Sequence, residues 1–160
     1  MYDADKPMLV GLVLLISALV GLLATGVLGA DSIAPYTAKT PYSEKIEIAG
    51  VPLHVEVADT DTERINGLSD RDQIAANQGM LFVFEESGRY PIWMRNMRFP
   101  LDIYWLDGHG VIVDVWKNAH PDSYPQIFEP RDEAYYVLEV VAGFSELYNI
   151  EIGDRVTGLE

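Results

Sequence analysis

An uncharged run of 23 residues near the N-terminus, residues 8–30, is the strongest constraint on how this chain can fold. As a helix it would be roughly 34 Å long, which is enough to cross a bilayer core of about 30 Å. We therefore expect a short leader at residues 1–7 and a single transmembrane anchor at residues 8–30. The 130 residues that follow must then build their own hydrophobic core, and that length is sufficient for one domain.

A cleaved signal peptide is the alternative for this segment. Signal peptides have a basic leader, an apolar region of about 7–15 residues and small residues before the cleavage site. Here the leader has one basic residue, Lys6, and two acidic residues, Asp3 and Asp5. The apolar run is longer than that of a signal peptide, and the large side chain of Leu28 occupies the −3 position before Ala30. These features favour an uncleaved anchor in the cell membrane with the soluble domain outside the cytoplasm. Secretion after cleavage remains the alternative.

Small side chains recur at every fourth residue of the expected anchor. They are Ser17, Gly21, Thr25 and Gly29. Such residues fall near one helix face and allow a second helix to approach closely. Two interpretations stay open: a homodimer through this face, or the ordinary abundance of small residues in membrane helices.

Residues 31–160 are strongly acidic, with 23 acidic against 10 basic side chains. The acids are scattered and arginine outnumbers lysine, which favours a surface kept soluble at high salt. An acidic patch for a cationic partner is the alternative. No basic stripe is present to meet phosphates, so we expect no nucleic-acid partner. The chain has no cysteine, which excludes disulfides, thiol nucleophiles and zinc ribbons.

The soluble part divides into a linker and one domain. Residues 31–43 contain two prolines and no sustained periodicity, which is typical of a tether. Residues 44–160 contain seven or eight short runs that predict strands, with hairpins over residues 46–57 and 101–116. We expect a turn at residues 87–88, a strand at residues 92–94 and an irregular loop over residues 118–132.

Two or three short helices are expected among these strands. Thr60 and Glu63 form a capping box that predicts a helix start, with Gly67 at its end, and residues 142–147 predict another. No alternation of strand, helix and strand is evident. The domain is therefore expected to be mostly β, as a small antiparallel barrel or roll with two or three short helices behind the N-terminal membrane helix.

Several separate blocks of the domain stand in the order found in one known family. They are Gly67-Leu68-Ser69 with Arg71, Gly79-Met80-Leu81-Phe82, Trp93-Met94-Arg95-Asn96 with Pro100-Leu101-Asp102-Ile103, Tyr136-Val137-Leu138-Glu139 with Ala142-Gly143, and Gly153-Asp154-Arg155-Val156. This arrangement resembles the DUF192 (UPF0127) family over residues 51–156. Arg95 and Met97 stand where the family has Lys and Thr. The family is a domain of unknown function, often secreted or attached to membranes, so the resemblance informs fold and location but not chemistry.

The polar members of these blocks are the candidate binding residues. Arg71, Trp93, Asn96 and Asp102 would together supply a cation, an aromatic surface, an amide and a carboxylate, which suits a small-molecule, glycan or peptide ligand. The alternative is structural: Arg71 and Asp102 form a buried salt bridge, and Asn96 caps a turn. We expect a ligand-binding or interaction module.

A small hydrolase acting on cell-surface glycan or peptide is the second hypothesis. Asp102 and Glu139 are its candidate acid and base, because paired carboxylates can cleave a glycosidic bond. His120, with Asp122 nearby, is the one histidine that merits a test. No EF-hand spacing or phosphate-binding glycine loop is present, so we expect neither a metal nor a cofactor.

Overall fold

The computed structural model describes residues 44–159. The expected leader (residues 1–7), anchor (8–30) and linker (31–43) lie outside the described residues, and so does residue 160. Among residues 44–159, no helix is long and apolar enough to cross a membrane. The description that follows concerns the domain at residues 44–159 alone.

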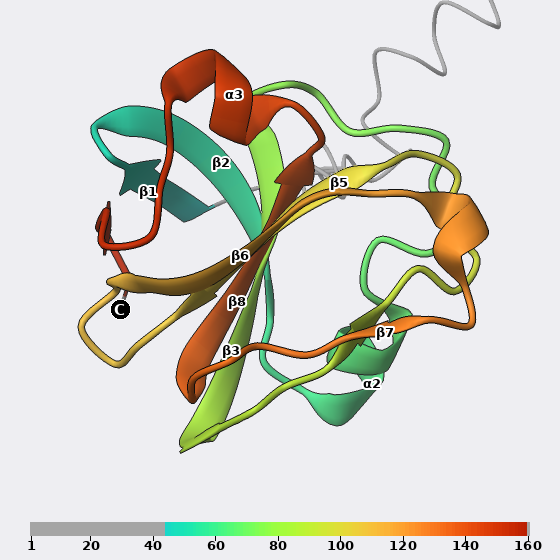
Figure 1. The fold of residues 1–160 in the computed structure, drawn as a ribbon, viewed down its shortest axis with the longest axis horizontal. Helices are drawn as coiled ribbons and strands as arrows, with labels where there is room; N and C mark the ends of the chain where they lie inside the picture. Colours follow the sequence, from blue (N-terminus) through green and yellow to red (C-terminus); the bar gives the residue numbers. More distant parts are fainter. Residues whose placement is uncertain (1–43, 160) are drawn as a thin grey trace, which may run out of the picture. The chain divides into compact units, whose positions relative to one another are not determined.

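Short strands dominate the described residues (Figure 1). In chain order the elements are β1 (Glu44–Ile48), β2 (Val51–Ala58), α2 (Asp61–Asn66), β3 (Gln78–Gly88), β4 (Ile92–Trp93), β5 (Leu101–Leu106), β6 (Ile112–Ala119), the 3-10 helix η1 (Pro121–Ser123), β7 (Ile127–Phe128), β8 (Ala134–Val141), α3 (Phe144–Tyr148) and β9 (Val156–Thr157).

One curled sheet of seven strands carries the fold, in the order β6-β5-β8-β3-β2-β1-β9, and β4 pairs with β7 in a separate two-stranded sheet. A bridge between Val111 and Arg155 joins the segments just before β6 and just before β9. The two outer edges of the sheet therefore meet at this point. The curled half-barrel sheet and the two short α-helices confirm that the domain is mostly β, as expected.

One connection departs from the expected antiparallel pairing. Strands β2 and β3 are parallel, with Val55 opposite Gly79 and Val57 opposite Leu81, and α2 lies in the crossover between them. Parallel neighbours require such a crossover. The sequence predicted the helix from its capping box, but no local signal showed that the strands on either side of it pair in parallel.

The hairpin and capping signals were reliable, whereas one other turn and the short strands were not. The hairpins β1–β2 and β5–β6 and the capping box at Thr60 are confirmed. The expected turn at residues 87–88 is wrong, since β3 continues to Gly88. The expected strand at residues 92–94 is only the two-residue β4, and the expected irregular loop contains η1 and β7.

Both faces of the sheet are covered, which explains why all six residues of β5 are buried. Alternate residues of a strand point to opposite faces, and the buried side chains form two separate clusters. We call the first the α2 face; its buried members include Leu68, Met80, Phe82, Met94, Ile103, Trp105 and Val137. We call the second the α3 face; its members include Leu53, Leu81, Tyr104, Leu138, Val140 and Phe144.

Candidate functional site

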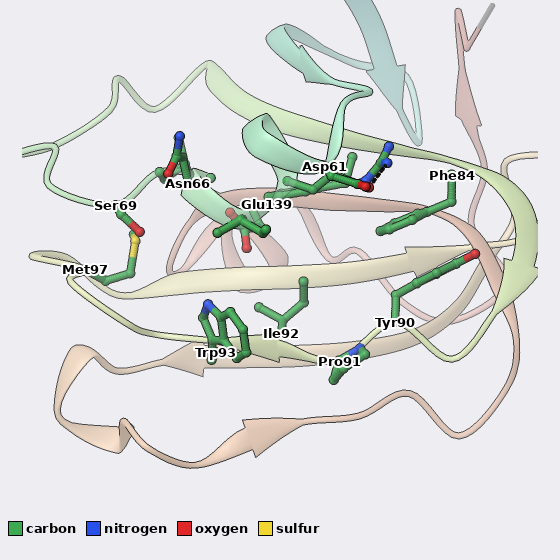
Figure 2. Close-up of a pocket in the computed structure, with 15 residues that line it drawn as sticks. Asp61, Asn66, Ser69, Phe84, Tyr90, Pro91, Ile92, Trp93, Met97 and Glu139 are labelled. Atoms are coloured by element: carbon green, nitrogen blue, oxygen red, sulfur yellow. Dashed lines mark hydrogen bonds and ion pairs between the residues drawn. The ribbon is translucent and has the colours of Figure 1, made fainter.

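A cavity of about 280 Å3 opens on the α2 face, between helix α2 and the segment that contains β4 (Figure 2). Its apolar and aromatic lining residues are Ile65, Leu68, Phe82, Phe84, Tyr90, Pro91, Ile92, Trp93 and Met97. Its polar lining residues are Asp61, Arg64, Asn66, Ser69 and Glu139. A concave, mostly apolar site with a few polar groups is the usual form of a small-molecule site.

Glu139 is the buried polar group of this cavity. It lies in β8 between Met80 of β3 and Ile103 of β5, so its neighbours across the sheet are apolar. Its side chain is 4% exposed, and Figure 2 shows it between helix α2 and the β4 segment. No residue of the described domain donates a hydrogen bond to its carboxyl group.

This environment controls the protonation of Glu139. Burial raises the pKa of its carboxyl group from 4.5 to about 8, and the nearby charge of Arg71 acts in the opposite direction. Low polarity disfavours the charged form of an acid. At neutral pH the group is therefore mostly a neutral carboxylic acid, which has one O–H donor and free acceptor oxygens.

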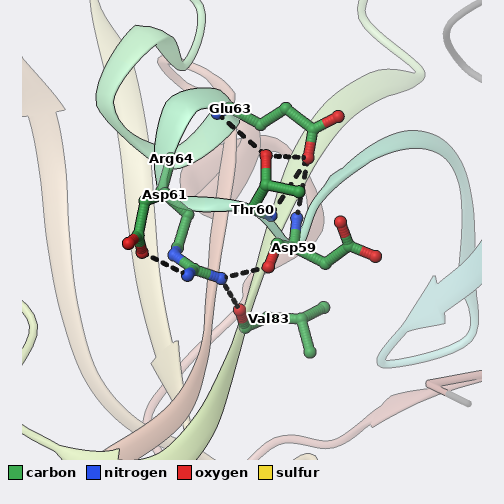
Figure 3. A network of polar contacts seen from close by, with 6 residues as sticks. All are labelled: Asp59, Thr60, Asp61, Glu63, Arg64 and Val83. Atoms are coloured by element: carbon green, nitrogen blue, oxygen red, sulfur yellow. Dashed lines mark hydrogen bonds and ion pairs between the residues drawn. The ribbon is translucent and has the colours of Figure 1, made fainter.

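Helix α2, one wall of the cavity, is fixed at its start by the capping box (Figure 3). The backbone N–H of Glu63 donates to Oγ1 of Thr60 at 3.3 Å, and the backbone N–H of Thr60 donates to Oε2 of Glu63 at 3.0 Å. The Thr60 hydroxyl also donates to this carboxylate at 2.7 Å. These bonds from Thr60 lower the pKa of Glu63, which fixes a charged cap at this end of the helix.

Arg64 ties the same helix to the sheet. Its Nη1 donates to the carbonyl oxygens of Asp59, at 2.6 Å, and Val83, at 2.7 Å (Figure 3). Its Nη2 pairs with Asp61 at 2.6 Å, and its guanidinium lies 5.3 Å from the ring centre of Phe84. One side chain thus holds α2 over β3 while covering an aromatic ring of the cavity wall.

The opposite wall is the segment from Tyr90 to Met97. The rings of Tyr90 and Phe84 are stacked with centroids 3.4 Å apart, and the indole N–H of Trp105 donates to the Tyr90 carbonyl at 2.8 Å. Farther along, the Ser69 hydroxyl donates to the carbonyl of Arg95 at 3.0 Å. This wall is therefore attached both to the sheet and to the loop after α2.

Trp93 is the exposed aromatic residue of this wall. It pairs with Ile127 of β7, its side chain is 42% exposed, and the guanidinium of Arg95 lies 5.2 Å from its ring. An indole at a cavity mouth offers a flat apolar surface together with one N–H donor. Trp93, a candidate binding residue of the sequence, thus lies at the mouth of this cavity.

Asp102 lies on the α3 face, away from Trp93 and Glu139. It stands opposite Val140 in the sheet, one position from the Ile103–Glu139 pair. It is 1% exposed, and its oxygens accept the backbone N–H groups of Asn118, at 2.9 Å, and Ser145, at 2.8 Å. Asp102 therefore links the end of β6 to the start of α3.

The other two candidate binding residues do not line the cavity. Arg71 pairs with Glu56 at 2.9 Å, so its ion-pair partner on the sheet is Glu56 of β2. Asn96 is exposed and adopts a positive φ of 56°, and its carbonyl accepts the N–H of Asp70 at 2.9 Å. The structure thus brings together Trp93 and Glu139 from the sequence candidates.

Several cavity residues carried no functional signal in the sequence. Arg64 lies in a short polar helix, and Phe84, Tyr90 and Met97 look like ordinary strand or core residues. Only the fold brings them to one place. Among residues 44–159, no group of three or more His, Asp or Glu side chains is arranged to hold a metal ion. His120 lies at the surface, where Nδ1 accepts the N–H of Asp122.

Comparison with known proteins finds a match to an uncharacterised family. Residues 44–158 match the DUF192 family, which is described as an uncharacterised ACR family. A UPF0127 protein from Thermococcus gammatolerans is 32% identical over 106 residues. That match covers 65% of this chain and 65% of the relative, so the chain spans somewhat less than two thirds of its length.

Two crystal structures have the same fold. A protein from Sinorhizobium meliloti 1021, described as a candidate transcription regulator, is 34% identical with a TM-score of 0.70, covering 75% of this chain and 97% of that protein. A protein of unknown function from Novosphingobium aromaticivorans is 26% identical with a TM-score of 0.66, covering 70% of this chain and 82% of that protein.

Proposed function

The chain belongs to the DUF192 family, and from the geometry of its cavity we propose that the domain is a ligand-binding module. The ligand is a small molecule, or a peptide side chain or sugar unit of a larger partner, that enters between α2 and β4. Its apolar part packs against the aromatic wall, and its polar part reaches Glu139. This is a binding role and requires no covalent step.

The observation that supports this proposal most strongly is the position of the Glu139 carboxyl group, which lies in a buried wall of the cavity and accepts no hydrogen bond from the described residues. Polar groups in folded domains find hydrogen-bond partners in protein, water or ligand, so the hydrogen bonds of this carboxyl group must come from whatever fills the cavity. Here the group is 4% exposed and faces a cavity lined by apolar side chains. A bound ligand would supply such a hydrogen bond.

A hydrolase is the second candidate, and the pKa of Glu139 supports it. An acid whose pKa is raised to about 8 is suited to donate a proton near neutral pH. The partner carboxylate in the two-acid hypothesis, Asp102, lies on the other face with both oxygens engaged. Any hydrolytic reaction would therefore use Glu139 without Asp102.

We also propose that residues 8–30 anchor the domain in the cell membrane with the domain outside the cytoplasm. The support is the uncharged run and the absence of a typical cleavage site. Fractionation of cells and protease treatment of intact cells test this directly. Recovery of a shortened chain from the medium would indicate cleavage and secretion instead.

Thermal unfolding of the full-length protein in high salt, against a library of small amides, amines, glycans and short peptides, tests the binding role. A ligand of the native state raises the melting temperature. We expect hits whose effect is lost in Trp93→Ala and kept in Trp116→Ala, because both indoles are 42% exposed but only Trp93 lines the cavity. Hits that act equally on both variants would place the binding site elsewhere.

A further inference from the structure

We infer that the polar group recognised by this cavity is an uncharged carboxamide, bound to the carboxyl group of Glu139 by a pair of hydrogen bonds. This inference rests on the proposed binding function and specifies the chemistry of the ligand. It begins from the polar groups of the cavity and from which of them remain available.

The other polar side chains deep in the walls are already engaged. Arg64 donates to two backbone carbonyls and to Asp61, and the Ser69 hydroxyl donates to a carbonyl. The Tyr90 hydroxyl donates to the carbonyl of Glu86 at 2.6 Å, and burial raises its pKa, so it stays neutral. Glu139 is thus the buried lining group left to bind a polar ligand atom.

A neutral carboxyl group presents one donor next to one acceptor. A carboxamide presents the complementary pair, because its carbonyl oxygen accepts the O–H and its N–H donates to the C=O. An ammonium group would instead require an ionised Glu139 and the release of its proton. A carboxylate ligand would place a second negative charge in the same apolar cavity, which is costly.

The charges around the cavity do not favour an ionic ligand of either sign. On one side, Arg64 and Asp61 of α2 pair with each other at 2.6 Å. On the other, Arg71 pairs with Glu56 of β2 at 2.9 Å. Arg64 and Arg71 therefore have anionic partners, and Glu139, mostly neutral at pH 7, adds little net charge. The third cation, Arg95, lies over the Trp93 ring at the cavity mouth and donates to the carbonyl oxygen of Ile65 at 3.5 Å.

The size of the cavity is sufficient for a ring that carries such a group. An apolar cavity of about 150 Å3 accommodates benzene, and this one measures about 280 Å3. Four probes that share one ring therefore separate the chemistry: benzamide, benzylamine, benzoate and toluene. Each is titrated into the full-length protein at pH 6.5 and pH 9, and the indole N–H signal of Trp93 is followed by NMR.

We expect benzamide to bind about tenfold more tightly than toluene at pH 6.5, through the two added hydrogen bonds. This preference should shrink at pH 9, above the pKa of Glu139, which is about 8. Glu139→Gln should keep the preference and lose its pH dependence, since an amide also offers a donor and an acceptor. Glu139→Leu should bind toluene and benzamide equally.

The possible results of this titration distinguish a failure of the carboxamide inference from a failure of the proposed binding function. If toluene binds as tightly as benzamide, or if benzylamine binds most tightly, the cavity binds ligands but the carboxamide inference is wrong. Retention of the benzamide preference in Glu139→Leu would also overturn it. If none of the four probes shifts the Trp93 signal, the binding function fails together with the inference.

Discussion

Two carboxyl groups of this domain, Asp102 and Glu139, are buried on adjacent strands of one sheet and have opposite environments. Asp102 is 1% exposed and Glu139 is 4% exposed. Asp102 accepts two backbone hydrogen bonds, whereas Glu139 faces a cavity and accepts none from the described residues. The two carboxyl groups are similarly buried but have different roles. Asp102 holds the fold together, and Glu139 is available to a ligand.

The largest expected effect is the loss of the Asp102 carboxylate. Asp102→Ala leaves the buried N–H of Ser145 and the partly buried N–H of Asn118 without their acceptor, so we expect the free energy of unfolding to fall by about 4–5 kcal/mol. Glu139→Leu should leave it unchanged or raise it, because a leucine suits the apolar surroundings. Urea unfolding at pH 7 measures both. Similar losses in the two variants would remove the distinction between the carboxyl groups.

A pH series on the wild type gives the next largest effect. The pKa of Glu139 rises from 4.5 to about 8 on folding. At pH values between these two, the folded state therefore keeps a proton on Glu139 that the unfolded chain has released. The Glu139 contribution to the free energy of unfolding should therefore fall by roughly 3–4 kcal/mol from pH 5 to pH 8 and level off above.

The matched control for this series is Glu139→Gln, which cannot titrate at this position. The difference in unfolding free energy between wild type and variant isolates Glu139 from the many exposed acids of the chain. Urea unfolding at half-unit steps of pH measures it. A difference that does not change with pH would mean that Glu139 has an ordinary pKa and is hydrated.

Much of the fold could be predicted from the sequence because local signals decide it. The hairpin turns and the capping box at Thr60 act over a few residues, and the structure contains them. The parallel β2–β3 pair and the β4–β7 pair depend on contacts distant in sequence. Since β4 and β7 have two residues each, they show no periodicity to detect.

The site was harder to predict because the sequence does not show which face a residue occupies. All six residues of β5 are buried, so no polar and apolar alternation distinguishes its two faces. The sequence therefore suggested Asp102 as the carboxylate beside Trp93 and named Glu139 only for the hydrolase hypothesis. Arg64 carried no functional signal in the sequence, although its side chain fixes one wall of the cavity.

Arg64→Met should have an intermediate effect on stability and tests whether α2 shields Glu139 from water. It removes one hydrogen bond from α2 to β3 and one to Asp59, just before the helix, so we expect the free energy of unfolding to fall by about 2 kcal/mol. Glu139 should become more hydrated, and its pKa should move down towards 4.5, as measured by carbon-13 NMR of its carboxyl group. Arg98→Met is the control, because Arg98 pairs with the exposed Asp72. An unchanged Glu139 pKa would mean that α2 does not shield it.

Trp93→Ala should have the smallest effect on stability, less than about 1 kcal/mol, because its side chain is half exposed. Its effect on ligand affinity should be larger, since it removes the aromatic surface at the cavity mouth. Thermal unfolding with and without ligand measures both quantities in one experiment. A large stability loss without a change in ligand affinity would assign Trp93 to the core alone.

The central claim, that Glu139 and not Asp102 faces the binding site, is tested most directly by carbon-13 NMR of the two carboxyl groups. The full-length protein is titrated with a ligand found in the thermal screen. We expect the Glu139 carboxyl signal to shift with ligand concentration while the Asp102 signal stays in place. A shift of the Asp102 signal with Glu139 unmoved would place the site on the α3 face and contradict the account.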